Sequence, residues 1–363
     1  MKIGILTFCC AHNFGAALQC YALVTYLSSR GHDVRTINYC PEYLVSHKPQ
    51  YCSMTKEIGQ KIKDIAYYIR LRYRYRLYET FSKKYFHLTE KCHDATDLKR
   101  ICTDFDYVVI GSDQVWNGKY NGNDKVWWGG FAASGSAPKL LAYAASAGNM
   151  TFGTADAGFI SEAIKRFTAV SVREGTLNEE LTSLCGLSTG QRGITTVLDP
   201  TLLLPYKYWR KWRRPDLSGR YIVIYQGDHP DDNIFHVAQS LKKKLGCKIV
   251  VTDFYYNNKN ADCAFKTISP KRFVTLVMNA ECVLTNSFHG VALSIACRTN
   301  FYSFPALSTK DQRITALLVS LGLQNRAVTD SLAEYSAMDY DKVNEKLNVL
   351  RTESDEFIKS NIV

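Results

Sequence analysis

A single histidine follows an apolar stretch of the chain in the segment LTNSFHGVAL (284–293). The apolar run CVL (282–284) has the pattern of a strand, and VALSIAC (291–297) has the pattern of a helix. His289 and Gly290 are therefore expected in a strand-to-helix turn. A helix N-cap with a packed histidine would explain this turn, and so would a phosphate or carboxylate site that contains an acid/base group.

Three other turns between an expected strand and an expected helix carry polar residues. FCCAHNFGAALQ contains Asn13 and Gly15, VVIGSDQVWN contains Ser112 and Asp113, and SVREGT contains Arg173. Helix N-termini offer N–H donors to anions, glycine admits a ligand close to the backbone, and arginine can bind a carboxylate with two N–H groups. A surface ion pair for Arg173, and an Asx-turn or helix cap for Asp113, stay open as alternatives.

Other features narrow the chemistry. Asp199 precedes Pro200 at the end of another expected strand, where turn formation is at least as good an interpretation as ligand contact. The glycine-rich fingerprints of dinucleotide-binding and P-loop proteins are absent from the sequence, which argues against both classes. The twelve cysteines show no C-x-x-C pair and no zinc spacing, so buried free thiols are favoured over disulfides or a metal site.

The elements that must position these turns alternate between strand and helix patterns along the 363 residues. This rhythm is typical of parallel sheets covered by helices. It predicts an α/β fold of two doubly wound Rossmann-like domains facing a cleft, similar to the two-domain GT-B-like glycosyltransferase architecture. We expect an N-terminal domain (1–200) with a helical basic insertion (42–95). A C-terminal domain (201–338) and a final helix (339–363) that packs back complete the prediction.

The net charge of +11 is uneven, because residues 61–84 hold eight Lys/Arg against two acids. Interleaved with tyrosines, this segment fits a solvated helix, an anionic membrane surface or a phosphorylated substrate. Nucleic acid is the weakest interpretation, since no recognised binding motif accompanies the charge. No apolar run approaches the length of a membrane span and no signal peptide is recognised, so we expect a cytoplasmic protein, with possible peripheral contact at the inner membrane face.

Seven segments of the chain follow one another in this order: NFGAALQCYAL, DYVVIGSDQVWN, LLAYAASAG, AVSVREGT, VLDPTLLL, LTNSFHGVALS and DQRITALLVSLGL. Together, over about residues 3–323, they resemble the polysaccharide pyruvyl transferase family. The resemblance implies phosphoenolpyruvate as co-substrate, without a further cofactor or metal. It also implies transfer of its pyruvate unit as a ketal to two sugar hydroxyls, commonly the 4- and 6-hydroxyls of a hexose, with release of phosphate.

The resemblance also implies roles for individual residues. His289 matches the proposed acid/base group, with Ser287, Phe288 and Gly290 beside it at the donor site, and Arg173 matches an arginine expected to hold the donor's carboxylate or phosphate. Several relatives have arginine where this chain has Ser287. Arg313 or another basic residue of the second half would then supply the missing cation.

The acceptor side is expected to include Asn13, Gly15, Ser112 and Asp113. The expected acceptor is a sugar on a polyprenyl-diphosphate lipid in exopolysaccharide or capsule synthesis. Two alternatives stay open from the sequence. One is a nucleotide-sugar glycosyltransferase of similar architecture, for which no base-binding signature is visible. The other is a non-catalytic binder of anionic surfaces, which rests on the charge of +11 alone.

Overall fold

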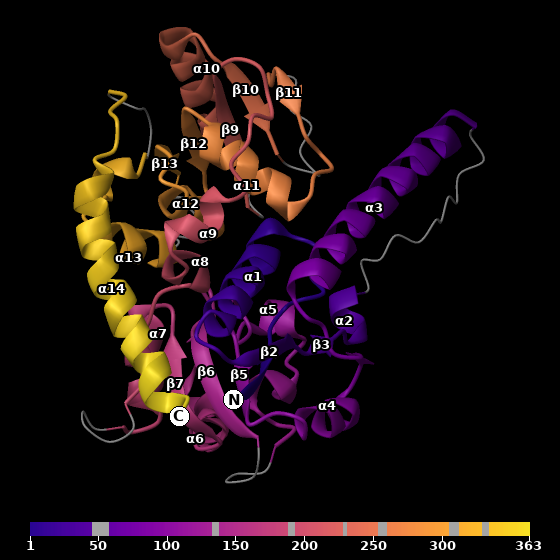
Figure 1. Ribbon diagram of the computed structural model, residues 1–363, viewed down its shortest axis with the longest axis vertical. Coiled ribbons are helices and arrows are strands. Elements are labelled where there is room, and N and C mark those ends of the chain that lie inside the picture. Colours follow the sequence, from indigo (N-terminus) through magenta and orange to yellow (C-terminus); the bar gives the residue numbers. More distant parts are fainter. Residues whose placement is uncertain are drawn as a thin grey trace.

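Two parallel sheets with helices on their faces form the core of the computed structural model (Figure 1). The predicted fold class, two doubly wound Rossmann-like units, is confirmed. No helix among the residues that the structure describes has the length and apolarity needed to span a bilayer. The described residues are 1–45, 58–132, 138–187, 193–227, 231–252, 260–304, 312–328 and 334–363.

The first sheet comes from the amino-terminal half and has the strand order β2-β1-β5-β6-β7-β8. All of its neighbouring strands pair in parallel, with Ile3 opposite Tyr107 in the β1–β5 register. Its central strands are apolar runs buried on both faces, as parallel sheets require. The strands are β1 (Lys2–Leu6), β2 (Asp33–Thr36), β5 (Tyr107–Ile110), β6 (Lys139–Ala145), β7 (Phe167–Val172) and β8 (Thr195–Thr196).

The second sheet comes from the carboxyl-terminal half and has the order β11-β10-β9-β12-β13, again entirely parallel. Its strands are β9 (Tyr221–Tyr225), β10 (Lys248–Val251), β11 (Cys263–Ala264), β12 (Cys282–Thr285) and β13 (Phe301–Ser303). A separate two-stranded sheet pairs β3 (Asn38–Tyr39) with β4 (Lys91–Cys92).

Helices connect and cover the strands, and most begin at the carboxyl end of the strand before them. In the first half they are α1 (Phe14–Ser28), α2 (Glu42–Val45), α3 (Ile58–Tyr85), α4 (Ala95–Cys102), α5 (Gly118–Asn121), α6 (Ala157–Ile164) and α7 (Gly175–Leu184). The remaining helices are α8 (Pro200–Leu203), α9 (Tyr206–Arg210), α10 (Asn233–Leu245), α11 (Pro270–Asn279), α12 (Phe288–Ala296), α13 (Gln312–Leu321) and α14 (Tyr340–Asn361). Short 3-10 turns are η1 (Lys125–Trp128), η2 (Thr154–Asp156) and η3 (Gln324–Arg326).

The basic insertion predicted at 42–95 contains the helices α2 and α3, but it also contributes the strand β4. Its residues 46–57 lie outside the described part of the chain. The tryptophan-rich loop after β5 is packed, since Trp116 and Trp128 stack with ring centroids 4.3 Å apart and both are buried.

One hydrophobic core runs through both halves of the chain. Phe14 of α1 stacks on Phe273 of α11 with ring centroids 4.2 Å apart, and α8 and α9 pack into the same core instead of forming an exposed linker. Burial also raises the pKa of the Cys20 thiol in this core to about 12.

The last helix, α14, runs along both halves (Figure 1). Near its start Tyr340 Oη donates to the Thr299 carbonyl (2.6 Å) in the second half. Near its end the Leu198 amide of the first half donates to Ser354 Oγ (2.9 Å).

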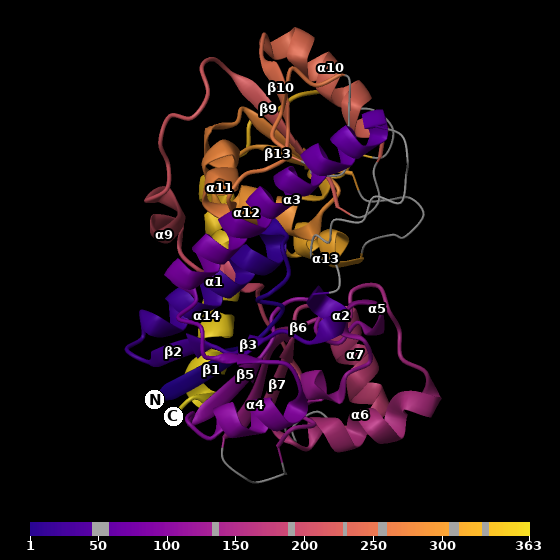
Figure 2. The same ribbon diagram turned by 90° about the vertical axis from the view of Figure 1, so that its right-hand side faces the viewer.

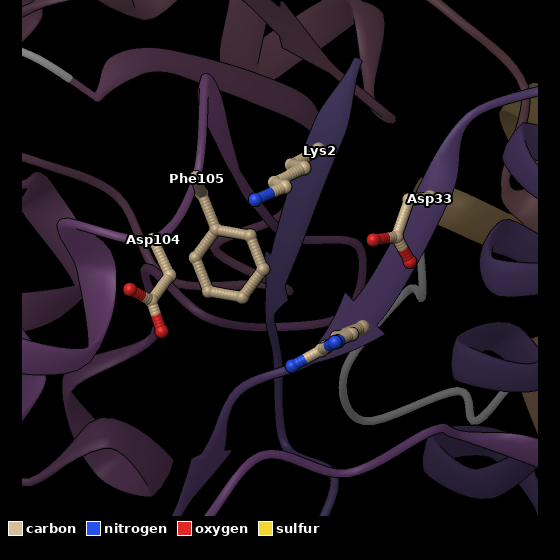
Figure 3. Close-up of a pocket in the computed structure, with 5 residues that line it drawn as sticks. Lys2, Asp33, Asp104 and Phe105 are labelled. Atoms are coloured by element: carbon tan, nitrogen blue, oxygen red, sulfur yellow. The ribbon is translucent and has the colours of Figure 1, made fainter.

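A polar hollow of about 240 Å³ lies at the amino-terminal edge of the first sheet (Figure 3). Its lining includes Lys2 of β1, Asp33 of β2, and Asp104 and Phe105 before β5. In doubly wound sheets ligands bind at the other edge, beyond the carboxyl ends of the strands. That carboxyl edge holds the residues singled out from the sequence.

Candidate functional site

Both sheets reverse their strand order at a point occupied by predicted site residues. In the first sheet the order reverses between β1 and β5, and in the second between β9 and β12. Such switch points open a crevice for ligands at the carboxyl ends of the strands. Asn13 and Gly15 follow β1, Ser112 and Asp113 follow β5, and His289 follows β12.

The two switch points meet at the buried carboxylate of Asp199. His289 Nε2 lies 3.5 Å from Asp199 Oδ2, with the two side chains 12% and 0% exposed. Asp199 Oδ1 caps α8 by accepting from the amide (2.9 Å) and hydroxyl (2.6 Å) of Thr201. Oδ2 also accepts from Arg173 (2.9 Å) and Ser112 Oγ (3.3 Å). One carboxylate thus holds groups from both halves.

The electrostatics of this site favour an ionised Asp199. Burial alone would raise the pKa of this carboxyl group. The close approach of His289 and its charge when protonated, the charge of Arg173 and the bond from Thr201 outweigh burial, and they hold the pKa well below its ordinary value. Asp199 can therefore act as a permanent acceptor beside the His289 ring.

Arg173 is buried in the structure, and its guanidinium already contacts other residues of the protein. Its side chain is only 3% exposed, which excludes the surface ion pair considered above. Its nitrogens donate to Asp199, to Glu174 (3.4 Å) and to Ser146 Oγ (3.0 Å), and its guanidinium carbon lies 4.2 Å from the centre of the Phe288 ring. Burial lowers the pKa of Arg173, but the neighbouring carboxylates raise it overall, so the cation is fixed. These bonds use three of the five N–H groups of the guanidinium, and its burial leaves little access for a donor anion.

Glu174, expected from the sequence only as a possible ion-pair partner of Arg173, is a second buried acid. The residue is 2% exposed, and its Oε1 accepts from Ser146 Oγ and Arg173. Among the described residues, its buried Oε2 has no hydrogen-bond partner. Burial raises the pKa of this carboxyl group, although Arg173 opposes the shift. The available signal was its position, one residue beyond Arg173 at the end of β7.

The two glycines predicted to open the backbone to a ligand are both filled by neighbouring side chains. A Cβ atom on Gly15 would lie 2.3 Å from His289 Nδ1, so the missing side chain makes room for the histidine ring. A Cβ atom on Gly290 would lie 2.1 Å from Thr285 Oγ1. Thr285 of β12 therefore fills the space beside the Gly290 Cα, and the donor-site role of Gly290 stays a prediction.

The other acceptor-side candidates form local hydrogen bonds. Asn13 caps α1 by accepting the Ala16 amide (2.7 Å). Asp113 accepts the Gln114 amide (2.8 Å), in line with the turn role considered above. Ser112 is fully buried and bonds to Asp199 and to the Ala144 carbonyl (3.1 Å). Of these candidates, Ser112 and Gly15 contact the central residues directly.

Ser287 stands where the family resemblance implies an arginine, and Arg313 is the expected replacement for its positive charge. Ser287 is the N-cap residue of α12, and its amide donates to Thr285 Oγ1 (3.0 Å). The guanidinium carbon of Arg313 lies 5.9 Å from the Phe288 ring centre, and this residue is only half-buried. Its charge also lowers the pKa of Glu174. Arg313 thus brings a positive charge next to the turn of Ser287, where the family resemblance led us to expect a missing cation.

Three helices of eight or more residues begin at this cluster. Gly15 in the first turn of α1 touches the His289 ring in the first turn of α12, and Arg173, just before α7, lies over Phe288. The positive ends of the three helix dipoles therefore converge, which favours an anion of the size of a carboxylate or phosphate. No group of three or more potential metal ligands is found among the described residues.

Comparison with known sequences identifies one family. The sequence model of a family described as polysaccharide pyruvyl transferase matches residues 13–306, which is more than half of the chain. No curated protein matches the sequence significantly.

Distant structural similarities extend over nearly the whole chain. An α-glucosyltransferase in complex with UDP and DNA is 10% identical, with a TM-score of 0.48, over 98% of this chain and 90% of that one. A UDP-GlcNAc 2-epimerase from Neisseria meningitidis, bound to UDP-GlcNAc, is 10% identical, with a TM-score of 0.46, over 99% and 93%. The E. coli ADP-heptose LPS heptosyltransferase II is 12% identical, with a TM-score of 0.39, over 98% and 100%. At these values the similarities say nothing about the activity of the chain.

Proposed function

Because this chain belongs to the polysaccharide pyruvyl transferase family, we propose that it moves the pyruvate unit of phosphoenolpyruvate onto two hydroxyls of a sugar. The product would be a cyclic ketal, for which we propose the 4- and 6-hydroxyls of a hexose, and phosphate would be released. The observation that supports this chemistry best is His289 held 3.5 Å from a buried, ionised Asp199 at the junction of both switch points.

The proton chemistry of the proposed reaction needs a group that both gives and takes protons. Protonation of the methylene carbon of phosphoenolpyruvate makes the adjacent carbon electrophilic, and a sugar hydroxyl attacks it and loses its proton. The bond to the phosphate oxygen then breaks, and the second hydroxyl closes the ketal as its proton leaves. We assign these transfers to His289, because histidine titrates near neutral pH and such catalysis contributes about 10² to 10⁴ in rate.

Asp199 would orient this histidine. A carboxylate oxygen can only accept, so Asp199 favours the form of His289 that carries a proton on Nε2. Nδ1, which lies beside Gly15 at the start of α1, would then be the nitrogen that exchanges protons with the substrate. Arg173, which donates to Asp199, Glu174 and Ser146, would hold the Asp199 carboxylate in place on the side away from the substrate.

The donor's negative charge would be held by Arg313 together with the first turns of α1, α7 and α12. In this proposal Arg313 supplies the positive charge that an arginine at the position of Ser287 would supply in relatives. The assignment rests on Arg313, a half-buried residue whose guanidinium lies near Phe288, in contrast to the buried side chain of Arg173. The phosphate would leave toward the converging helix dipoles, which stabilise its growing charge.

For the acceptor we propose a sugar linked to a polyprenyl diphosphate, used at the cytoplasmic face of the membrane in capsule or exopolysaccharide synthesis. Residues 61–84 would provide the peripheral membrane contact, because eight of these residues are basic and two are acidic.

The experiment is phosphate release from phosphoenolpyruvate with and without a panel of lipid-linked and free sugars, together with the mass of each product. We expect acceptor-dependent release and a product heavier than the acceptor by pyruvate minus water, which the variant His289→Ala should abolish. Activity with nucleotide sugars in place of phosphoenolpyruvate would contradict the proposal, as would full activity of the histidine variant.

A further inference from the structure

Helix α3 is packed at one end and stands clear of the molecule at the other (Figure 1); in Figure 2 the view is onto this helix, which lies in front of the second half. Near its carboxyl end Tyr78 and Phe81 are buried in the shared core, against α1 and α11. Toward its amino end the helix projects away from both sheets, and the side chains from residue 61 to 70 are exposed or half-exposed. This projecting segment has a surface that the rest of the described chain does not cover.

Large apolar side chains line one face of the projecting segment. Ile62, Ile65, Ile69 and Tyr73 are 62%, 44%, 61% and 55% exposed. Their spacing of three, four and four residues places them within about 80° of the helix circumference, at about 100° per residue. These four residues form a continuous apolar stripe, which we call the α3 stripe. An exposed stripe of this kind marks an interaction surface.

Basic side chains border the α3 stripe on both sides. By the same geometry, Lys63 and Arg70 lie about 80° to 100° to one side of Ile62, and Lys61 and Arg72 lie as far to the other side. All four are exposed. This is the arrangement of a helix that lies in a membrane interface, with apolar side chains between the acyl chains and flexible cations reaching the lipid phosphates.

We propose that α3 docks the protein on an anionic lipid surface, with the α3 stripe inserted and its four flanking cations on the phosphate groups. Charge complementarity decides between possible occupants of the stripe. A second copy of this chain, packed stripe against stripe, would bring the cations of the two copies together, which is unfavourable. An anionic bilayer offers acyl chains to the apolar α3 stripe and phosphate groups to the cations on either side of it.

The docking helix is tied directly to the loop that precedes α1. Arg74 donates to the His12 carbonyl (2.7 Å), and the rings of Tyr75 and His12 lie 4.0 Å apart. His12 is three residues before Gly15, which packs on His289. Docking would therefore bring the bilayer to the helix that borders the active centre. This consequence rests on the proposed function, since a lipid-linked sugar would then be delivered close to His289. The docking surface defines the peripheral contact proposed there for residues 61–84, and it can be tested without any substrate.

The test is co-flotation of the full chain with vesicles of phosphatidylcholine alone or mixed with phosphatidylglycerol, without any substrate. We expect binding to the anionic vesicles that weakens with added salt. The triple variant Ile62→Ser/Ile65→Ser/Ile69→Ser should reduce it more than tenfold. Because one basic residue near an anionic surface contributes about 1 kcal/mol, each of Arg70→Gln and Arg72→Gln should reduce it about fivefold.

Matched controls remove the same side chains elsewhere. Val319→Ser/Val349→Ser deletes exposed apolar residues from α13 and α14, and Lys243→Gln/Lys244→Gln deletes exposed cations from α10. Both should bind anionic vesicles like the unmodified chain. Circular dichroism should show that the α3 variants are folded.

Several outcomes would overturn the proposal. These are equal binding to neutral vesicles, unchanged binding of the triple variant, or an oligomer in sedimentation that the triple variant disperses, since a second copy would then cover the stripe. Activity on a soluble acceptor separates the two proposals. If docking alone is wrong, the α3 variants and the unmodified chain stay equally active, whereas if the proposed function is wrong, none of them is active.

Discussion

Replacing Asp199 with asparagine tests how the site works, because it removes a charge and keeps the shape. Oδ1 of the asparagine can still accept from Thr201 and cap α8. The amide nitrogen would replace Oδ2, where the structure has Arg173 at 2.9 Å and His289 Nε2 at 3.5 Å. The amide N–H group would then face the N–H group of Arg173, and both would be hydrogen-bond donors. The same amide N–H group would favour a His289 ring that lacks the proton on Nε2.

The expected loss of activity follows from the histidine's role. If Asp199 sets the protonated form of His289, Asp199→Asn should lower kcat by about 10² to 10⁴, the range of general acid/base catalysis, with little change in KM for phosphoenolpyruvate. The pH profile should also change, because the histidine loses its charged partner. Activity within twofold of the unmodified enzyme, with an unchanged pH profile, would refute the assigned role.

The expected loss of stability follows from the buried ion pair. Removing one partner of such a pair costs about 3 to 5 kcal/mol, and Arg173 keeps Glu174, so we expect about 3 kcal/mol at pH 7. Since the pKa of Asp199 is lowered on folding, its contribution is present above the unfolded pKa of about 3.9 and is lost as pH falls toward the folded value. In urea unfolding, the gap between variant and unmodified chain should be constant from neutral pH to about pH 5 and shrink below about pH 4.

Asp124 provides a matched control for this substitution. It is also a capping carboxylate, accepting from the Val126 amide (3.0 Å) and the hydroxyls of Tyr39 and Tyr43. Asp124→Asn should therefore lower stability without the loss in kcat. If both variants lost activity equally, a general loss of rigidity, and not the His289 partner, would explain the result.

Three further substitutions, one with a matched control, address other parts of the structure. Gly15→Ala should lower kcat and cost about 1 to 3 kcal/mol in urea unfolding, because its Cβ would clash with His289, whereas Gly158→Ala in the open surface of α6 should stabilise by about 0.4 to 1 kcal/mol. Arg313→Gln should raise KM for phosphoenolpyruvate about 10-fold to 100-fold and change kcat less, since a hydrogen bond to a charged group contributes about 1.5 to 3 kcal/mol; an unchanged KM would remove it from the donor site. Ser354→Ala should cost about 1 to 3 kcal/mol in thermal or urea unfolding, because it leaves a buried backbone amide of the first half unpaired; a loss below about 0.5 kcal/mol would mean that α14 contributes little there.

The alternation of strand and helix patterns was sufficient to predict the fold class and the strand ends that carry polar residues. His289, Arg173 and Phe288 were also recognisable, because family motifs mark them, and the structure brings them together. Those motifs are short and local, so they could identify positions on the chain.

The partners of these residues could not be predicted in the same way. Asp199 also lies in a family segment, VLDPTLLL, but that segment does not show its partners: its importance comes from burial and from contacts with residues 26 positions before it and 90 positions after it. The roles of Gly15 and Gly290 depend on which side chain fills the space beside each, and that neighbour is fixed by tertiary packing. Glu174 differs from a surface glutamate only by its burial.

Because both halves share one core, the buried cysteines can serve as probes of unfolding. All eleven cysteines among the described residues are free thiols, and Cys20 of the first half and Cys297 of the second half both lie in this common core. Burial raises the pKa of both thiols, so neither can react with a labelling reagent until its surroundings open. Because one core encloses both, the two thiols should become reactive at the same denaturant concentration, and a mass spectrum of the labelled chain would record the loss of both halves as a single event.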